Sequence, residues 1–552
     1  MTNGPVFVKC LQALHSPERV PSMRTLLVNL TRFGDLLQTQ PVISGLRQAG
    51  HEPGLVCLDN FVAATALLND LAYVRPFPGA RFMTLLDADW RAAALDLATW
   101  ARHTADAFKP DVVTNLTAAL SVRLVAKLLA QQHPQPRLEG FCLDNQGFGF
   151  SSNTWGTFLL ASSQNRGCSP FNLVDLFWKS CGLGDTPRDY QLRRPDEAAM
   201  AATRQLLAPA GHSRLVAFQL GASENRRRWP VASFSTLGRR LHHELGLTPV
   251  LLGSKAEAEL GRRYAAAGGA GLDLIGATSL PELAAVLLQT EFLVTNDTGT
   301  MHLAAGLDVP VAAIFLATAQ PWDTGPYKAG ALCLEPDLDC HPCPFGKPCP
   351  YNEKCRQTIT ADGLFELLKA ARGAEPGLEN EIDATPPRNA GARVWRTEVE
   401  EAHFMGLRSL SGHENADRTQ WVRLQRHVYR HFLDQKPIPP CPGTATQLGA
   451  EMRQSVLVAL DQSHKLLTLL AEQGKVLAHD PMAPLKKKFM ATWQRVQGLW
   501  DQTPALNVLG HLWLSESQDS GRDMPAIHEL LTRYAALTRS WLDHFESGTH
   551  LE

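Results

Sequence analysis

The chain repeats one pattern twice: short β-rich apolar runs alternate with longer segments whose apolar residues recur at helical spacing. The first series begins at Met23 with "RTLLVNL", and the second begins near residue 191. Parallel strands need a crossover between them, which a helix supplies, so this alternation predicts parallel βαβ units. At 552 residues the chain is also too long for one hydrophobic core. We therefore expect an α/β fold with two Rossmann-like parallel-sheet domains in tandem.

A different pattern follows the second series. After residue 393 long segments carry apolar residues at helical spacing, and no further β-rich run is expected. Tryptophans in these segments suit core positions, because large aromatic side chains dominate burial; they are Trp493, Trp500, Trp513 and Trp541. The predicted organisation is an N-terminal extension (1–22), two Rossmann-like domains (23–190 and 191–373), a linker (374–393) and an all-α C-terminal accessory domain (394–552).

Composition narrows the classes of function. The hydrophobic fraction of 44% and the charged fraction of 20% are ordinary for a soluble globular protein. A formal net charge of -2 gives no overall field that would attract nucleic acid, so we expect no such partner. The sequence has no apolar run long enough to span a membrane, and residues 1–22 lack a secretory signal pattern. These features favour a cytoplasmic protein.

The first of three unusual loops, "NLTRFGDLLQTQP", follows the first expected strand. In open parallel sheets ligands bind outside the carboxyl ends of the strands, where loops lead into helices. Gly34 permits a tight turn at this place, and Asp35 then falls at the start of a helix. Taken alone, Asp35 is explained as an N-cap that accepts hydrogen bonds from the first amides of the helix.

The second loop is "FQLGASENRRRWP", in which Gly221 closes a strand and three arginines precede the next helix. Loop amides, a helix N-terminus and guanidinium groups together make an anion site that suits phosphate. The alternative is that Arg226, Arg227 and Arg228 form an ordinary solvated surface. The position of the cluster at the carboxyl end of a strand favours the anion site.

The third loop is "NDTGTMH", which stands between two apolar runs. Asp297 follows a predicted strand, and Thr298, Gly299 and Thr300 open the next helix, where small residues let backbone amides approach a ligand closely. Asp297 could accept hydrogen bonds from sugar hydroxyls, with His302 one turn into the helix. A capping aspartate with a satisfied core histidine explains the same residues.

Taken together, the three loops resemble those of the ADP-heptose–lipopolysaccharide heptosyltransferases, glycosyltransferase family nine. The residues that carry the resemblance are "FGD", "RRRWP", "NDTGTMHLAAGLDVPVAAIF" and "DTGPY". It extends over residues 23–372 and is strongest in the second domain. The resemblance implies a GT-B fold, with two Rossmann-like domains facing each other across a cleft. It also implies an inverting transfer of a sugar, usually from ADP-heptose, to a hydroxyl of a lipopolysaccharide-core or similar glycan.

The resemblance also implies roles for individual residues. Asp35 matches the catalytic base, and Arg227 stands where the family usually has a lysine on the donor phosphates. One carboxylate would take the proton of the acceptor hydroxyl, and fixed donors would stabilise the leaving diphosphate. No Asp-x-Asp motif is evident in these loops, so we expect no catalytic metal. The implied donor-binding residues are Arg226, Arg227, Asp297, Thr298, Gly299, Thr300 and His302, with Gly34 and Gly221 supporting the loops.

One segment departs from the family pattern. After the expected strand "TPVLLG" the chain reads "SKAEAE", whereas family members often place an acidic or amide-bearing residue just there to meet the nucleoside. Lys255 or Glu257 would have to serve instead. The donor could therefore carry another base than adenine or another sugar than heptose.

A cysteine-rich segment follows the third loop. Cys340, Cys343, Cys349 and Cys355 have the spacing C-x2-C-x5-C-x5-C, which is a candidate structural site for zinc or iron in a cytoplasmic protein. An iron–sulfur cluster fits the same spacing. A similar segment in many heptosyltransferase relatives is not generally a required metal site. Reduced thiols or a disulfide are the alternatives.

Two other functions fit the same sequence. The chain could glycosylate serine or threonine hydroxyls of a partner protein, with the helical domain as the docking module. Alternatively it could be a non-catalytic GT-B scaffold whose helical domain mediates assembly or oligomerisation. The run from Lys486 to Lys488 would suit a peripheral contact with the inner face of the cytoplasmic membrane, or simply a solvated helix face.

Overall fold

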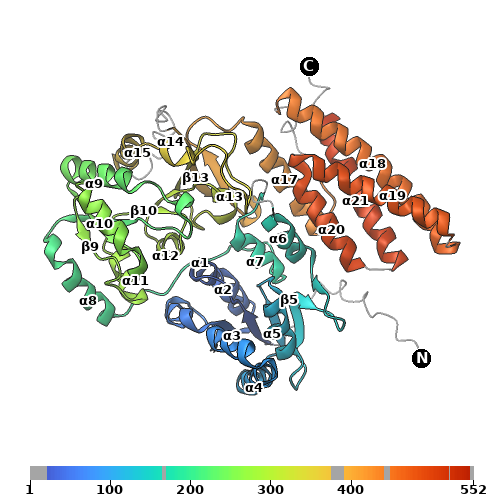
Figure 1. Cartoon of the computed structure of the whole chain (residues 1–552), viewed down its shortest axis with the longest axis horizontal. Helices are drawn as coiled ribbons and strands as arrows, with labels where there is room; N and C mark the ends of the chain where they lie inside the picture. Colours follow the sequence, from blue (N-terminus) through green and yellow to red (C-terminus); the bar gives the residue numbers. More distant parts are fainter. Residues whose placement is uncertain are drawn as a thin grey trace.

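The computed structural model describes residues 22–164, 169–373, 391–440, 448–480, 482–520 and 523–546. Within these ranges the chain forms two β-sheets, each covered by helices, and a bundle of long helices beside them (Figure 1). The predicted extension and most of the predicted linker lie outside the described residues. The two helix-covered sheets confirm the expected pair of Rossmann-like domains.

The first sheet has six strands in the order β3-β2-β1-β4-β5-β6. Strands β1 to β5 pair in parallel, and β6 is antiparallel to β5. The strands are β1 Arg24–Val28, β2 Glu52–Leu58, β3 Tyr73–Phe77, β4 Val112–Asn115, β5 Arg137–Leu143 and β6 Gly149–Ser151. Central β1 has four buried residues in five, as expected for a strand covered on both faces. The helical segments of the first domain are α1 Phe33–Leu37, α2 Gln40–Gln48, η1 Asp59–Leu67, α3 Gly79–Ala88, α4 Trp90–Phe108, α5 Leu120–Ala130, α6 Thr154–Gln164 and α7 Leu173–Ser180.

The second sheet has eight strands in the order β14-β13-β12-β11-β10-β7-β8-β9. Strands β7 to β12 pair with one another in parallel, whereas β13 and β14 are antiparallel to their neighbours. The strands are β7 Arg214–Gln219, β8 Leu247–Leu252, β9 Leu272–Asp273, β10 Leu293–Asn296, β11 Val311–Ile314, β12 Leu332–Pro336, β13 Ala392–Val399 and β14 Met405–Ser409. The helices are α8 Glu197–Leu207, α9 Val231–Leu245, α10 Ala258–Ala266, α11 Leu280–Leu287, α12 Gly299–Gly306, α13 Pro321–Thr324, α14 Cys355–Thr358 and α15 Ala361–Gly373.

The expected absence of strands after residue 393 is wrong. Strands β13 and β14 form an antiparallel extension of the second sheet next to β12. The segment "ARVWRTEV" places Val394 and Trp395 in the core, while its two arginines and its one glutamate are half-buried. The charged residues interrupt the apolar run, so the sequence pattern did not indicate a strand here. The long helices therefore start only at Asp417.

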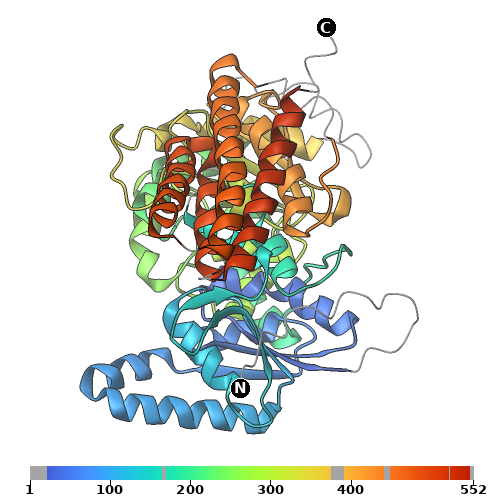
Figure 2. The same ribbon diagram turned by 90° about the vertical axis from the view of Figure 1, so that its right-hand side faces the viewer.

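The C-terminal bundle contains α17 Asp417–Leu433, α18 Ala450–His479, α19 Ala483–Gln502, α20 Asn507–Ser520 and α21 Met524–Glu546. Figure 2 shows its long helices side by side. Trp500, Trp513 and Trp541 are fully buried, as predicted, and the half-buried Trp493 packs against the same core. This core also includes Phe158 of α6 and Leu176 of α7. The bundle is thus continuous with helices of the first domain.

Substitution of Trp541 tests the importance of this core. The indole is 0% exposed and its ring centroid lies 5.7 Å from that of Trp421 and 5.5 Å from that of Tyr429. Trp541→Ala should lower the free energy of unfolding by about 3–5 kcal/mol in chemical denaturation. Trp90→Ala is the matched control, because that side chain is 59% exposed, and its effect should stay within about 0.5 kcal/mol. Equal effects would contradict the assignment of Trp541 to the core.

Candidate functional site

A cleft of about 1150 Å³ lies between the two sheet domains. One wall comes from the first domain and includes Asp35, Asn60, Leu159, Ser162 and Phe171, and the other comes from the second domain. The residues predicted from the sequence that line it are Gly34, Asp35, Arg227, Asp297, Thr298, Gly299, Thr300 and His302. Of the predicted site residues, Arg226, Gly221 and the four cysteines do not line it. Segments far apart in the sequence thus meet at one place.

Asp35 lies in the first turn of α1, after the carboxyl end of β1. The cap position of α1 is Arg32, three residues earlier, so the N-cap explanation of Asp35 is wrong. The backbone around it is fixed, because Asn29 Nδ2 donates to Thr39 Oγ1 at 2.7 Å and to the Asp35 carbonyl oxygen at 3.3 Å. The carboxylate therefore stands on a short, well-held helix at the edge of the cleft.

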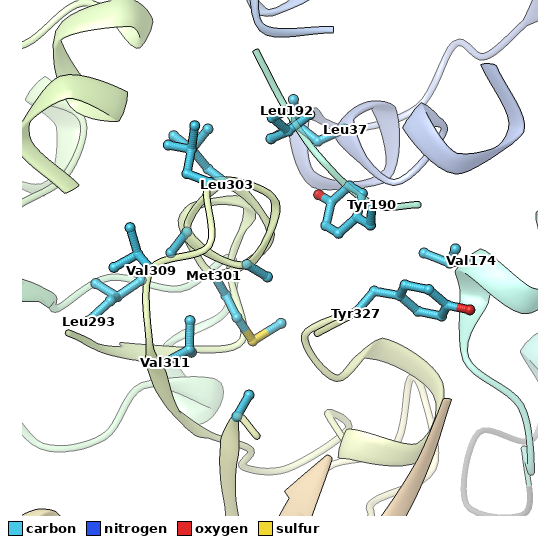
Figure 3. Packing of buried hydrophobic residues seen from close by; sticks show 14 of the residues in the cluster. Leu37, Val174, Tyr190, Leu192, Leu293, Met301, Leu303, Val309, Val311 and Tyr327 are labelled. Atoms are coloured by element: carbon cyan, nitrogen blue, oxygen red, sulfur yellow. The ribbon is translucent and has the colours of Figure 1, made fainter. Parts of the chain in front are cut away.

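Helix α12 carries the "TGTMH" segment and is buried on most sides. Figure 3 shows Met301 and Leu303 of this helix among strand residues such as Leu293 and Val311, with Tyr190 and Leu192 of the interdomain segment nearby. Apart from Gly299, every residue of α12 is buried. Because the helix is enclosed, its first turn has one direction open to a ligand, which is the cleft. Thr298 is its cap position but makes no side-chain cap bond, so capping does not explain this loop either.

The two wall helices α1 and α12 meet through glycines. A Cβ on Gly34 would lie 2.9 Å from His302 Cδ2, and a Cβ on Gly299 would lie 2.4 Å from Phe33 Cδ1. Both distances are shorter than real contacts of that kind, so the two positions need glycine. This close approach brings the backbone of the Asp35 helix against the start of the predicted donor-binding helix.

The arginine loop and the "NDTGT" loop are joined by Asn296. Its Oδ1 accepts from the Trp229 amide at 2.8 Å, and its Nδ2 donates to the Leu220 and Gly221 carbonyl oxygens at 3.0 Å. Arg227 consequently faces Asp297, and the two side chains form an ion pair in which each is only 8% exposed. Arg227 also donates to Ser223 Oγ at 3.1 Å. A cation and an anion are therefore held side by side in the cleft wall.

The three arginines of this loop point in different directions. Arg226 turns away from the cleft and donates to Glu224 at 2.7 Å and to the Lys347 carbonyl oxygen at 2.9 Å, so its expected place on the donor phosphates is not supported. Arg228 lines the cleft instead, with its guanidinium bonded to the Ala222 carbonyl oxygen. Gly221 supports the loop by leaving room for a carboxylate, since a Cβ there would overlap Glu257 Oε1.

His302 is the most deeply buried titratable group of the cleft wall. Its side chain lies under Gly34, it is 4% exposed, and burial lowers its pKa to about 4 although the nearby Asp297 acts in the opposite direction. The imidazole is therefore neutral at physiological pH. Tyr190 donates its hydroxyl to the His302 carbonyl oxygen at 2.9 Å, which fixes this turn of α12 from the interdomain segment.

Several cleft residues have no motif that distinguishes them in the sequence. Glu257 closes a capping box with Ser254, so its Oε2 accepts from the Ser254 amide at 2.7 Å. Ser279 begins α11 with another capping box, and Thr324 at the end of α13 donates to Asp297 Oδ2 at 3.4 Å. Capping boxes are common at helix starts, and only the fold shows that these two open into the cleft.

Three of the four cysteines lie in the loop before α14 and Cys355 is the first residue of that helix; all four are free thiols near one another. Burial, followed by the neighbouring sulfurs of Cys355, Cys340 and Cys349, raises the pKa of Cys343 to about 11. The amides of Tyr351 and Glu353 donate to Cys349 Sγ at 3.4 and 3.3 Å. Across the described ranges, no three His, Cys, Asp or Glu side chains are grouped so that they could hold a metal ion. This arrangement gives the predicted zinc or iron site no support.

Comparison with known proteins gives the same family as these loops. Residues 172–354 match the model of glycosyltransferase family 9 (heptosyltransferase). This stretch, about a third of the chain, is similar to that family. Lipopolysaccharide heptosyltransferase 1 of Pseudomonas aeruginosa is 35% identical over 155 residues, which are 28% of this chain and 41% of that protein. Lipopolysaccharide heptosyltransferase 2 of Salmonella typhimurium is 34% identical over 167 residues, which are 29% of this chain and 40% of that protein.

These matches span only about two fifths of the relatives' own length. The fold similarity is wider: a family 9 glycosyltransferase from Veillonella parvula aligns with a TM-score of 0.52 at 18% identity, over 63% of this chain and 97% of that one. The expected GT-B architecture is thereby confirmed. More than a third of this chain therefore has no counterpart in that structure.

The buried imidazole gives the stability of the protein a pH dependence. The pKa of His302 is about 4 in the fold, against an ordinary histidine value of 6.5, so the unfolded chain binds the proton first as the pH falls. The corresponding stability is present above pH 6.5 and is lost as the pH falls toward 4. Over that window the wild type should lose up to roughly 3 kcal/mol of unfolding free energy more than His302→Gln in chemical denaturation. Equal losses would show that His302 is not held neutral.

Proposed function

We propose that the protein is an inverting glycosyltransferase that moves a heptose from ADP-heptose to a hydroxyl of a lipopolysaccharide-core or similar glycan. The observation that supports it best is the composition of the cleft. A carboxylate, Asp35, stands on the wall of the first domain, and a cation, Arg227, stands with the start of α12 on the opposite wall. This arrangement suits a single in-line displacement, in which Asp35 takes the proton of the acceptor hydroxyl while the diphosphate leaves.

The donor wall supplies what a leaving diphosphate requires. Helix α12 starts at Gly299, so the first amides of this helix have no intrahelical acceptors and can donate to phosphate oxygens. Arg227 adds a charge-assisted donor in a place with little water. In the proposed mechanism these groups stabilise the developing charge, and turnover should therefore persist in the presence of a chelator of divalent cations.

The nucleoside belongs at the other end of the same wall. Glu257, Thr278 and Ser279 line that end, next to the apolar side chains of Leu280 and Leu283. A carboxylate accepts hydrogen bonds from ribose hydroxyls, and an apolar surface suits the face of a base. We therefore assign the role left open by the "SKAEAE" segment to Glu257 rather than Lys255, because Lys255 does not line the cleft.

The acceptor would enter from the wall of the first domain. The relatives are lipopolysaccharide heptosyltransferases, which makes a glycan hydroxyl the first choice. No helix within the described ranges is long and apolar enough to cross a membrane. The side chains of Lys486 to Lys488 are exposed on α19, as a solvated helix face requires. Reaction in the cytoplasm, contact with a membrane surface and oligomerisation through the bundle stay predictions.

The decisive experiment is ADP release by purified protein supplied with ADP-heptose and lipopolysaccharide-core acceptors, with Asp35→Asn as the variant. Asparagine keeps the size of the side chain but cannot take a proton, so turnover should fall by at least about 100-fold. Calorimetry should give nearly the same ADP affinity for both proteins. Loss of ADP binding in Asp35→Asn would assign a structural role to the carboxylate, and full activity would remove it from the mechanism.

Arg227 is tested through ADP affinity. Arg227→Ala removes charge-assisted hydrogen bonds to phosphate, each worth about 1.5–3 kcal/mol, so ADP should bind roughly 10- to 150-fold more weakly in calorimetry. Arg226→Ala is the matched control on the same turn, since Arg226 faces away from the cleft, and its effect should be small. If Arg226→Ala costs as much affinity as Arg227→Ala, the phosphate site is wrongly assigned.

A further inference from the structure

The C-terminal bundle is in direct contact with an element of the cleft wall. Helix α13 Pro321–Thr324 places Asp323 and Thr324 on the cleft, and its outer side meets α17 of the bundle. We propose that Arg418 and Arg426 of α17 are positioning residues that hold α13 in the donor site, so that the bundle is a working part of that site. The positioning of α13 does not depend on the proposed function; only its effect on donor binding and catalysis rests on that function.

Arg426 contacts both α13 and the first domain. Its side chain is 2% exposed, and its guanidinium carbon lies 5.7 Å from the ring centroid of Trp322 in α13 and 5.3 Å from that of Phe171 in the first domain. It donates to Glu400 at 2.8 Å and to the Met405 carbonyl oxygen at 2.9 Å. One buried cation of the bundle therefore touches both sheet domains.

Arg418 lies about two turns earlier on α17 and holds the residue that precedes α13. It donates to Gln320 Oε1 at 2.5 Å and to Glu335 Oε1 at 2.8 Å. Gln320 is the cap position of α13, and Glu335 is a fully buried residue of β12. Arg418 thus ties the beginning of α13 to the sheet, while Arg426 covers its tryptophan.

The residues that follow α13 are held from the first domain. Asn172, the cap residue of α7, donates to the Gly325 carbonyl oxygen at 3.0 Å. The buried carboxylate of Asp175 accepts from the Tyr327 hydroxyl at 2.8 Å and from Arg188 at 2.9 Å. Figure 3 shows Tyr327 beside Val174 of the same helix. Arg426 also donates to the Pro170 carbonyl oxygen, just before this helix begins.

A shift of α13 would disturb the ion pair between Arg227 and Asp297 in the cleft. Thr324 donates to Asp297 Oδ2 at 3.4 Å, and the same carboxylate oxygen is paired with Arg227. The path from the bundle to the donor site consists of successive contacts: Arg426 to Trp322, then Thr324 to Asp297, then Asp297 to Arg227. A bundle that only stabilised the fold would not need the contacts of Arg418 and Arg426 with α13.

Hydrogen exchange tests the positioning role without any substrate. Arg426→Met keeps most of the length of the side chain but removes its charge and donors. We expect the amides of residues 322–327 to exchange roughly 2- to 30-fold faster in this variant, the range that local coupling usually covers. Arg418→Met should give the same response at residues 320–325. Unchanged exchange in this segment in both variants would overturn the proposal.

Two controls separate positioning from general loss of stability. Leu467→Val weakens the bundle core at a fully buried residue of α18, so it should speed exchange within the bundle but leave residues 322–327 unchanged. Arg495→Met makes the same substitution as Arg426→Met at an exposed site of α19 and should change neither segment. If Leu467→Val also speeds exchange in residues 322–327, the bundle acts through stability alone and the proposal fails.

Nucleotide binding gives the functional readout. In calorimetry with ADP, Arg426→Met should bind roughly 2- to 30-fold more weakly than wild type, and the loss should be smaller in an Arg227→Ala background because both act on one pair. Strictly additive losses, or an unchanged affinity in Arg426→Met, would overturn the link to the donor site. A wild type that binds no ADP would instead refute the proposed function, while the exchange experiment would still decide the positioning role.

Discussion

The contact between Gly34 and Gly299 determines the geometry of the cleft. Two helices from different domains approach there so closely that neither position has room for a Cβ. The Asp35 carboxylate and the amides at the start of α12 consequently border the same cleft. The same approach covers His302 and keeps its imidazole neutral, which leaves Arg227 and Arg228 as the cations of the donor wall among the described residues.

The Arg227–Asp297 pair prepares the donor wall for an anion. Two opposite charges with 8% exposure each are costly to bury unless they are paired, and removal of one partner usually costs about 3–5 kcal/mol. The pairing holds the guanidinium at the cleft while no ligand is bound, so little reorganisation is needed when phosphate oxygens arrive. Asn296 contributes to this preorganisation, because its amide group fixes both loops from which the two charges project.

Much of this arrangement follows from the sequence. Parallel strands end at one edge of a sheet, so the "RRRWP" and "NDTGT" loops of the second sheet had to meet. The "FGD" loop belongs to the first sheet, and it reaches the same cleft because the two domains face each other. What the sequence could not supply is the direction of single side chains. Successive residues of the 3₁₀ turn Asn225–Arg227 point about 120° apart, so one arginine of the run faces the cleft while its neighbour faces the cysteine loop. Strands β13 and β14 were missed because charged residues interrupt their apolar pattern.

The bundle shows why arginines, rather than apolar side chains, suit an element that must fix another. Apolar packing between α17 and α13 would stabilise their contact but would tolerate sliding, since dispersion and the hydrophobic effect have little directionality. A guanidinium group donates in fixed directions within one plane. Arg418 donates to Gln320 and Glu335, and Arg426 lies over the Trp322 ring and donates to Met405. The two arginines together therefore define both the position and the rotation of α13. The hydrogen bond from Thr324 to Asp297 in the donor site forms only if the position and the rotation of α13 are fixed in this way.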